Sequence, residues 1–393
     1  MRWAVFASVL LGACYPVEGN ECDPGPFWDG PYLENPGAAS TGDRMLVVWR
    51  EVDIGDGVVT GTYRGAPTDG TTSDAPFDYE PGLAPRAMLS GSDRALVTGE
   101  LDGGGSFYEL RLASGARVAP AVELAAFTGT CAFDGDAFLI TRPNAVVRIA
   151  PDGTAGPPIS ITGIDECAAT SAVTWVITGG SDEPIVGRRI ARGGGVLDPD
   201  ARMILDDSYF FVAAARASEA VVISQDRDDR RTFVVLADDG TATAVPLAID
   251  VAFSRPTRLI GERAGYLLIL ESTGTSVVHG VRLAPDGTVL GAPFVLLDHA
   301  AGNTLVAVRT GDATTVVFDE LPHGGEAPRI DAIRIADGAP PSEPTTIETT
   351  TGEAYTVDCG CQAGHGVGWL AGLVLLGLCR SRSRCRRSRS PTS

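Results

Sequence analysis

The chain has 393 residues, 44% of them hydrophobic, which suffices for a folded core and excludes a wholly disordered protein. Its 48 glycines and 26 prolines are typical of many short strands joined by tight turns. The net charge is −19, although Arg2 and the arginines between Arg380 and Arg389 place positive charge at the two ends. The body is therefore strongly acidic, which argues against nucleic acid and anionic membrane surfaces as ligands and favours solubility over a cation-binding role.

The N-terminus is predicted to be a secretory signal. Arg2 precedes an apolar run that ends at Ala13 and is too short to span a bilayer. Leu11-Gly12-Ala13-Cys14 resembles the lipobox of bacterial lipoproteins, which implies a signal peptide of residues 1–13 and a diacylglyceryl group on Cys14. The alternative is an ordinary cleaved signal in which Cys14 is incidental. Residues 14–40 are expected to form a tether, and within them Glu18 to Pro36 could instead be a cap on the first structural unit.

A turn motif recurs through the middle of the chain, residues 41–348. Arg148-Ile149-Ala150-Pro151-Asp152-Gly153-Thr154 returns as Arg282-Leu283-Ala284-Pro285-Asp286-Gly287-Thr288. Weaker copies end at or near Gly115, Gly193, Gly240 and Gly338, and Gly57 is the candidate for the first copy. From Gly115 onward the copies lie roughly 40 to 50 residues apart, which is the length of one four-stranded propeller blade.

Each copy has the chemistry of a β-hairpin. Proline and glycine supply the two backbone conformations that a tight turn needs, and Asp-Gly between alternating strands is a strong hairpin signal. More apolar segments, predicted to be inner strands buried on both faces, are Phe138-Leu139-Ile140, Trp175-Val176-Ile177 and Leu267-Leu268-Ile269-Leu270. The Pro-Asp-Gly-Thr turn resembles units of bacterial extracellular propellers. We therefore expect an all-β propeller with seven blades, six or eight being the alternatives. The resemblance indicates the fold but does not identify the function.

Two cysteines occupy equivalent places in successive repeats. Cys131-Ala132 precedes one apolar strand as Cys167-Ala168 precedes the next, so the two lie side by side if the repeats are adjacent blades. We expect a Cys131–Cys167 disulfide in an oxidising compartment, with two buried free thiols as the alternative. Cys22 has no evident partner. The Thr-, Asp- and Pro-rich segment from Pro67 to Pro85 is interpreted as an insertion loop and a place for partner contacts.

The C-terminus combines three features in order. Residues 349–365 form a linker that contains Cys359-Gly360-Cys361, residues 366–379 are an apolar stretch expected to be a short transmembrane segment, and residues 380–393 are an arginine-rich tail expected in the cytoplasm. This order resembles the C-terminal sorting signals of myxobacterial surface proteins. The resemblance implies cleavage near Cys359, Gly360 and Cys361 by a sorting protease and transfer to the cell surface. The alternative is a plain membrane anchor, and both place the body in the cell envelope, outside the cytoplasm.

The sequence holds no recognised catalytic or metal-binding motif. Its four histidines are scattered at His279, His299, His323 and His365, and no zinc, nucleophile-elbow or calcium-loop pattern occurs. Gly103-Gly104-Gly105 and Gly193-Gly194-Gly195 are interpreted as hairpin turns rather than phosphate loops. The acidic clusters Asp226-Arg227-Asp228-Asp229 and Asp198-Pro199-Asp200 have oxygens suited to calcium, and exposed polar turns are the favoured interpretation.

Three functions follow as hypotheses. The leading one is a non-catalytic module at the outer membrane or cell surface that binds a protein or glycan through its loops, without a cofactor. The second is an extracellular hydrolase or lyase whose acidic residues come from separate blades and therefore leave no local motif. The third is a scaffold subunit of an envelope assembly complex. No nucleic-acid partner is expected.

Overall fold

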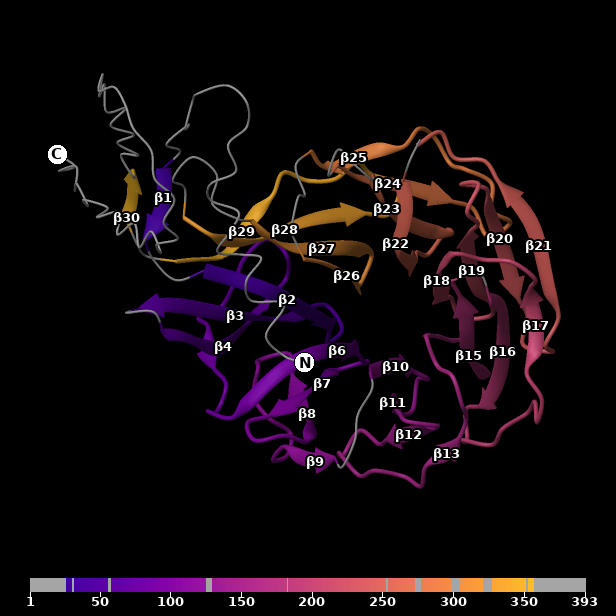
Figure 1. The fold of residues 1–393 in the computed structure, drawn as a ribbon, viewed down its shortest axis with the longest axis horizontal. Coiled ribbons are helices and arrows are strands. Elements are labelled where there is room, and N and C mark those ends of the chain that lie inside the picture. The colour runs from indigo at the N-terminus through magenta and orange to yellow at the C-terminus, as the bar shows by residue number, and fades with distance from the viewer. Residues whose placement is uncertain are drawn as a thin grey trace, which may run out of the picture. The chain divides into compact units, whose positions relative to one another are not determined.

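The computed structural model describes residues 26–29, 32–55, 58–124, 129–181, 183–251, 254–272, 277–298, 304–320, 327–350 and 353–356. Seven four-stranded antiparallel sheets stand around a ring in the order of the chain (Figure 1). This confirms the predicted all-β propeller with seven blades. No helix occurs in these ranges, and so none there is long and apolar enough to cross a membrane.

Each blade consists of four consecutive strands of the chain. Blade 1 contains β2 (Tyr32–Ser40), β3 (Met45–Gly55), β4 (Val58–Thr68) and β5 (Phe77–Asp78). Blade 2 contains β6 (Leu83–Ser90), β7 (Arg94–Leu101), β8 (Ser106–Leu112) and β9 (Val122–Leu124). Blade 3 contains β10 (Gly129–Phe133), β11 (Phe138–Arg142), β12 (Ala145–Ile149) and β13 (Ile159–Ser160). Blade 4 contains β14 (Glu166–Ala169), β15 (Val173–Gly180), β16 (Glu183–Ala191) and β17 (Arg202–Leu205).

The second half of the ring repeats the pattern. Blade 5 contains β18 (Phe210–Ala215), β19 (Ala220–Gln225), β20 (Arg231–Leu236) and β21 (Ala242–Leu247). Blade 6 contains β22 (Ser254–Gly261), β23 (Tyr266–Ser272), β24 (Val278–Leu283) and β25 (Phe294–Leu297). Blade 7 contains β26 (Leu305–Thr310), β27 (Ala313–Glu320), β28 (Arg329–Ala336) and β29 (Thr345–Thr349). Outside the blades, β1 (Pro26–Asp29) pairs antiparallel with β30 (Glu353–Thr356) in a two-stranded ribbon that belongs to a separate unit.

Burial follows the position of a strand in its blade. The second strands, such as β19 and β27, are buried at nearly every residue because both of their faces meet a neighbouring blade. The apolar segments at Phe138, Trp175 and Leu267 lie in second strands, which confirms their assignment as inner strands. The fourth strands are short and more exposed, as outer edges of a soluble sheet commonly are.

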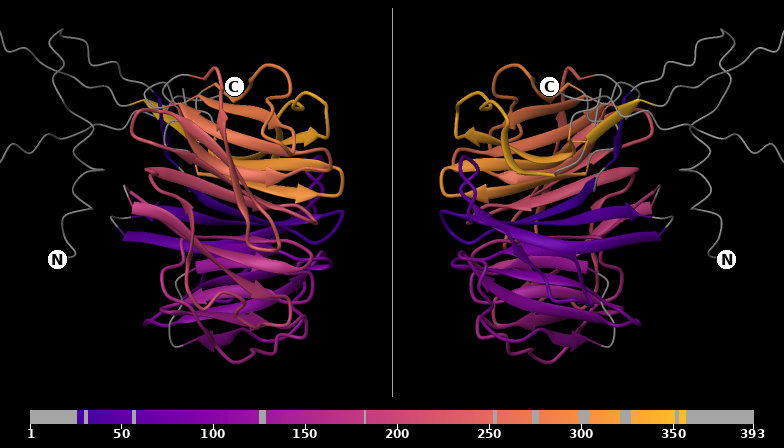
Figure 2. Two further views of the ribbon diagram at one scale, coloured as in Figure 1. Left: turned by 90° about the vertical axis from the view of Figure 1, so that its right-hand side faces the viewer. Right: turned by 90° about the vertical axis from the view of Figure 1, so that its left-hand side faces the viewer.

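The ring is held together by apolar packing between neighbouring blades. Among the described residues, one hydrophobic cluster fills each of the seven interfaces between neighbouring blades. The cluster between blades 1 and 7 contains Trp49 and Val47 of β3 together with Val317 of β27 and Ile330 of β28. No described strand of blade 1 pairs with blade 7, so side-chain packing closes the propeller. Figure 2 shows the ring from the side, with strand ends and loops on two opposite faces.

The repeated Asp-Gly turn joins the third strand to the fourth strand of a blade. In blades 3 and 6 it lies between β12 and β13 and between β24 and β25. In blade 1 the same place is taken by Asp69-Gly70-Thr71, between β4 and β5. The prediction that Gly57 marks the first copy is therefore wrong: Gly57 itself lies outside the described residues, between the second and third strands.

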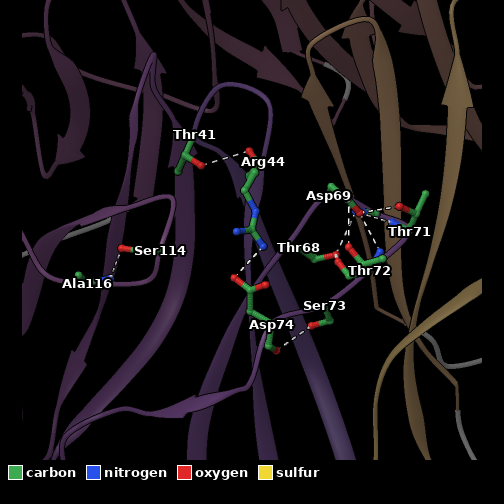
Figure 3. Close-up of polar contacts among 11 residues, drawn as sticks. Thr41, Arg44, Thr68, Asp69, Thr71, Thr72, Ser73, Asp74, Ser114 and Ala116 are labelled. Carbon is green, nitrogen blue, oxygen red and sulfur yellow. Dashed lines mark hydrogen bonds and ion pairs between the residues drawn. The ribbon is translucent and has the colours of Figure 1, made fainter.

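The interpretation of Pro67 to Pro85 as an insertion loop is also wrong. This segment contains the end of β4, the turn, β5 and the start of β6. Figure 3 shows the turn, in which the Asp69 carboxylate accepts hydrogen bonds from the backbone N–H groups of Thr71 (2.8 Å) and Thr72 (2.7 Å). These bonds, led by the one from the Thr71 hydroxyl, hold the pKa of Asp69 far below its usual range. Nearby, Arg44 pairs with Asp74 at 2.8 Å.

The turn of one blade also contacts the blade before it. Tyr108 of blade 2 donates a hydrogen bond from its hydroxyl to the carbonyl of Gly153 in the turn of blade 3 (2.8 Å). Arg189 of blade 4 donates to the carbonyl of Asp238 in the turn of blade 5 (2.5 Å). The motif that the sequence repeats is therefore both a hairpin turn and an inter-blade joint.

Candidate ligand-binding cavity

The loops of the propeller divide between two faces. Because consecutive strands are antiparallel, the loops that follow the second and fourth strands emerge on one face, which we call the interblade-loop face. The loops that follow the first and third strands, including the repeated turns, emerge on the other. A cavity of about 440 Å³ lies on the interblade-loop face where blade 5 meets blade 6. It is lined by Tyr209, Phe210, Gln225, Asp226, Arg227, Asp229, Ser254 and Arg255.

Two exposed aromatic rings form the apolar part of this cavity. Tyr209 and Phe210 are 40% and 37% exposed, and their rings meet edge to face with centroids 4.4 Å apart. The Arg227 guanidinium lies 5.7 Å from the centre of the Tyr209 ring. The backbone N–H of Tyr209 donates to the carbonyl of Gln225 (2.9 Å), which fixes the entry to β18 beside the end of β19. Tyr209 and Phe210 are the only exposed aromatic side chains among the residues whose burial the structure describes.

A tight acidic turn forms one side of the cavity. The Asp226 carboxylate accepts hydrogen bonds from the backbone N–H groups of Asp228 and Arg230, both at 2.9 Å. Asp229 adopts a left-handed backbone conformation with φ of 64°, which a short polar side chain tolerates. Its carboxylate accepts hydrogen bonds from the Gln225 amide and from Arg231, the latter at 3.0 Å.

Two buried polar side chains hold the wall of the cavity in place. Gln225 is 8% exposed, its amide nitrogen donates to Asp229, and its carbonyl oxygen has no hydrogen-bond partner. Arg231 lies behind the lining, is 6% exposed and donates to the carbonyl (2.7 Å) and hydroxyl (3.0 Å) of Ser254, while its Nε has no partner. Burial lowers the pKa of Arg231, and the charge of Asp229 opposes that effect. Other buried side-chain atoms of the described residues also lack a partner, so these two atoms do not by themselves mark a ligand site.

The acidic clusters singled out from the sequence are engaged by the protein itself. Asp198 is buried and accepts hydrogen bonds from Arg189 (2.7 Å) and Arg202 (2.6 Å). The bond from Arg189 is the main cause that lowers the pKa of Asp198 to about 2. In the ranges that the structure describes, no three His, Cys, Asp or Glu side chains are grouped so as to hold a metal ion.

The predicted disulfide is present. Cys131 of β10 and Cys167 of β14 are bonded, with their Cα atoms 5.1 Å apart, and they join blade 3 to blade 4. Both cysteines pack against a small cluster that has five buried residues. Gly103-Gly104-Gly105 and Gly193-Gly194-Gly195 lie in hairpin turns, as expected. Cys14, Cys359, Gly360 and Cys361 lie outside the described residues, as do three of the four histidines.

A second cavity of about 410 Å³ lies where blade 1 meets blade 2. Its wall contains the Arg111 guanidinium, which stands 4.6 Å from the Phe77 ring centre and 4.2 Å from that of Tyr79. Glu109, fully buried, pairs with Arg111 at 2.5 Å and with Arg117 at 2.6 Å. The charged groups here pair as ions, although Glu109 Oε2 and two Arg117 nitrogens make no hydrogen bond, and the network supports the interface that has the smallest apolar cluster among the described residues.

Sequence reasoning singled out Asp226 to Asp229 but missed Tyr209, Phe210 and Gln225. The one local signal was the aromatic Tyr209-Phe210 pair directly after the polar segment Asp206-Asp207-Ser208. The loops that carry these residues meet only because blades 5 and 6 are adjacent, and nothing in a single repeat records that contact.

Solved structures of low sequence identity share the fold. The β-propeller domain of the trilobed protease from Pyrococcus furiosus, described as having an open velcro topology, is 9% identical over 81% of this chain and 98% of that one, with a TM-score of 0.52. The lectin BP39L from Burkholderia pseudomallei is 11% identical over 82% of this chain and 100% of that one, with a TM-score of 0.52.

Prolyl oligopeptidase B from Galerina marginata is 8% identical over 83% of this chain, with a TM-score of 0.55, and the match spans only 51% of that chain. No protein-family model and no curated protein matches the sequence. These similarities establish that the chain has the β-propeller fold.

Proposed function

We propose that the chain is a recognition module of the cell envelope, which binds an external protein or glycan at the cavity between blades 5 and 6. The observation that carries this proposal is the meeting of two exposed aromatic rings, Tyr209 and Phe210, with the polar side chains of the Asp226 to Asp229 turn in one cavity. Cavities that combine apolar walls with a few placed polar groups are the usual form of small-ligand sites. One propeller of similar fold is a lectin, which supports recognition as a use of this scaffold.

The location belongs to the same proposal. A lipid on Cys14 and processing at Cys359-Gly360-Cys361 by a sorting protease would hold the propeller on the cell surface, where its loops meet external ligands. Peptide mass mapping of the native protein from its envelope fraction tests this. An acylated Cys14 peptide together with the loss of all peptides beyond Cys359 is expected. An intact arginine-rich tail would contradict surface display and would indicate that the protein is retained in the membrane.

A binding assay with the full-length protein tests recognition itself. Immobilised protein is exposed to surface material from the producing cells, and Tyr209→Ala is compared with Met203→Ala, a control at a 54% exposed side chain of β17. Loss of binding in Tyr209→Ala alone is expected. Binding that is equal in the two variants, or absent from the wild-type protein, would contradict recognition through this cavity.

An extracellular hydrolase is the second candidate, favoured by one observation. Glu166 of blade 4 is partly buried, and burial raises its pKa to about 7, although the charge of Arg258 from blade 6 opposes the shift. A carboxyl group poised near neutral pH suits general acid–base catalysis, and here an acid and a cation come from separate blades. Hydrolysis of a glycan or peptide by the wild-type protein, lost in Glu166→Gln, would favour the enzyme over the recognition module. Binding of a substrate without its hydrolysis would exclude the hydrolase for the substrates tried.

A further inference from the structure

The cavity between blades 5 and 6 has the size of a small-ligand site. Its volume of about 440 Å³ falls within the roughly 300–1,000 Å³ of such sites. A stable protein interface instead covers on the order of 800 Å² on each partner and is centred on a broad apolar patch. The exposed aromatic side chains here are confined to Tyr209 and Phe210 at one cavity, among the described residues. A compact group seated in the cavity fits this surface better than a flat protein face.

The polar wall of the cavity offers mainly hydrogen-bond acceptors. The carboxylates of Asp226 and Asp229 each have lone pairs beyond the hydrogen bonds that they accept, whereas the unpaired carbonyl oxygen of Gln225 is buried. The Arg255 guanidinium is paired with Glu271 at 2.8 Å, and the Ser254 hydroxyl donates to the carbonyl of Val251 at 3.0 Å. Acceptors of this kind call for a ligand that carries several donors, as hydroxyl groups do.

Overall charge disfavours acidic ligands at this cavity. Asp226 and Asp229 in its wall are matched by Arg227 and Arg255, whereas the chain as a whole has a net charge of −19. A carboxylate, sulfate or phosphate group would approach against this long-range field. We therefore expect a neutral ligand to bind more strongly than an acidic one.

The aromatic wall adds the last requirement, an apolar face on the ligand. Tyr209 and Phe210 lie edge to face, so the ligand meets a ring face and a ring edge at once. The Arg227 guanidinium near the Tyr209 ring places hydrogen-bond donors beside this wall. From these groups we infer that the cavity binds a neutral saccharide, whose ring packs its C–H face on Tyr209 and Phe210 while its hydroxyls reach Asp226 and Asp229. This inference rests on the proposed recognition function and narrows the ligand to one class.

Saturation-transfer NMR with the full-length protein tests the inference directly. The probes are the methyl glycosides of glucose, galactose, mannose, fucose and N-acetylglucosamine, with methyl glucuronide as the anionic probe. We expect at least one neutral probe to bind, and the glucuronide to bind more weakly. Tyr209→Ala should raise Kd about tenfold, the cost of roughly one aromatic contact. Met203→Ala and Glu80→Gln, at the second cavity, should leave Kd unchanged.

Gln225→Leu tests the polar wall through Asp229. It keeps the buried volume and removes the amide that donates to the Asp229 carboxylate, so we expect a less well positioned carboxylate and weaker binding of the same probe. If no neutral probe binds, or if Tyr209→Ala binds it as well as the wild-type protein does, the saccharide assignment is overturned. Protease and periodate treatment of the surface material then separate the saccharide assignment from the proposed recognition function. If binding depends on Tyr209, is destroyed by protease and survives periodate, the saccharide is rejected but recognition is kept. If binding does not depend on Tyr209, both are rejected.

Discussion

Gly70, in the turn of blade 1, lies against Thr315 in the second strand of blade 7. A Cβ placed on Gly70 would stand 3.2 Å from the Thr315 hydroxyl oxygen and 3.3 Å from its methyl group. Blades 1 and 7 share no described strand pairing, so this contact and the cluster around Trp49 close the ring. The last joint of the propeller is thus of the same kind as the others, a turn packed on the blade before it.

Gly70→Ala should destabilise the propeller through this joint. Gly103 is the matched control, because both glycines have positive φ (84° and 93°) while nothing lies within 4 Å of a Cβ on Gly103. Both variants have the backbone cost of alanine in this region, about 1–2 kcal/mol. We expect Gly70→Ala to lower the free energy of unfolding by about 1 kcal/mol more than Gly103→Ala, from crowding at Thr315. Urea denaturation measures both, and equal effects would show that Gly70 does not contribute to closure.

The Cys131–Cys167 disulfide should stabilise an interface whose apolar cluster is small. The bond closes a loop of 36 residues, which is worth on the order of 3 kcal/mol on the chain-entropy model. We expect the double variant Cys131→Ala/Cys167→Ala to unfold at a lower urea concentration than the wild-type protein. Adding a thiol reductant to the wild-type protein should lower its unfolding midpoint by the same amount. The reductant should not affect the double variant. A non-reduced digest without a linked Cys131–Cys167 peptide would contradict the bond.

Much of the fold is predictable from the sequence because one turn serves every blade. The Pro-Asp-Gly-Thr spacing predicts four-stranded repeats, and equal strand positions in adjacent repeats predict the disulfide. The turn of blade 1 was not predicted, for two reasons. A second Asp-Gly pair at Gly57 falls between the long strands β3 and β4, and the actual turn, Asp69-Gly70, is followed by a fourth strand of only two residues. Local patterns of this kind do not say which hairpin of a blade they belong to.

The cavity is less predictable for a physical reason. Tyr209, Gln225 and Ser254 lie at the ends of strands in two blades, and only the ring geometry brings them together. In the sequence Gln225 is the polar end of a strand, and only the fold shows that it is buried and that its amide donates to Asp229. The acidic turn was visible in the sequence, whereas the aromatic wall that gives the cavity a ligand class was not.

Glu109→Gln should be strongly destabilising, since Glu109 is fully buried and pairs with Arg111 and Arg117. Neutralising it leaves a buried guanidinium without its counter-charge, which we expect to cost about 3 kcal/mol. Glu80→Gln is the control, because Glu80 also pairs with Arg117 (2.6 Å) yet is 68% exposed, and such pairs contribute less than about 1 kcal/mol. Thermal melts of the two variants make the comparison. Similar small losses in both would mean that the network around Arg111 adds little to the joint between blades 1 and 2.

Stability should fall as pH rises toward neutrality because of Glu166. Burial raises its folded-state pKa from 4.5 to about 7, with a further increase from Asp165 and an opposing effect of Arg258. Between these two values the folded chain holds a proton that the unfolded chain releases, so the free energy of unfolding decreases as pH rises through that window.

We expect Glu166→Gln to remove a loss of about 1–3 kcal/mol in the free energy of unfolding between pH 5 and about pH 8, measured by urea denaturation at each pH. Burial also raises the pKa of Asp319 to about 6 and raises the pKa values of Glu262 and Asp331, so a slope of the same sign should remain in Glu166→Gln. Wild-type and Glu166→Gln curves that stay parallel from pH 5 to about pH 8 would mean that Glu166 is ionised in the fold and has no proton to offer at neutral pH. The hydrolase alternative would then lose the one observation that favours it.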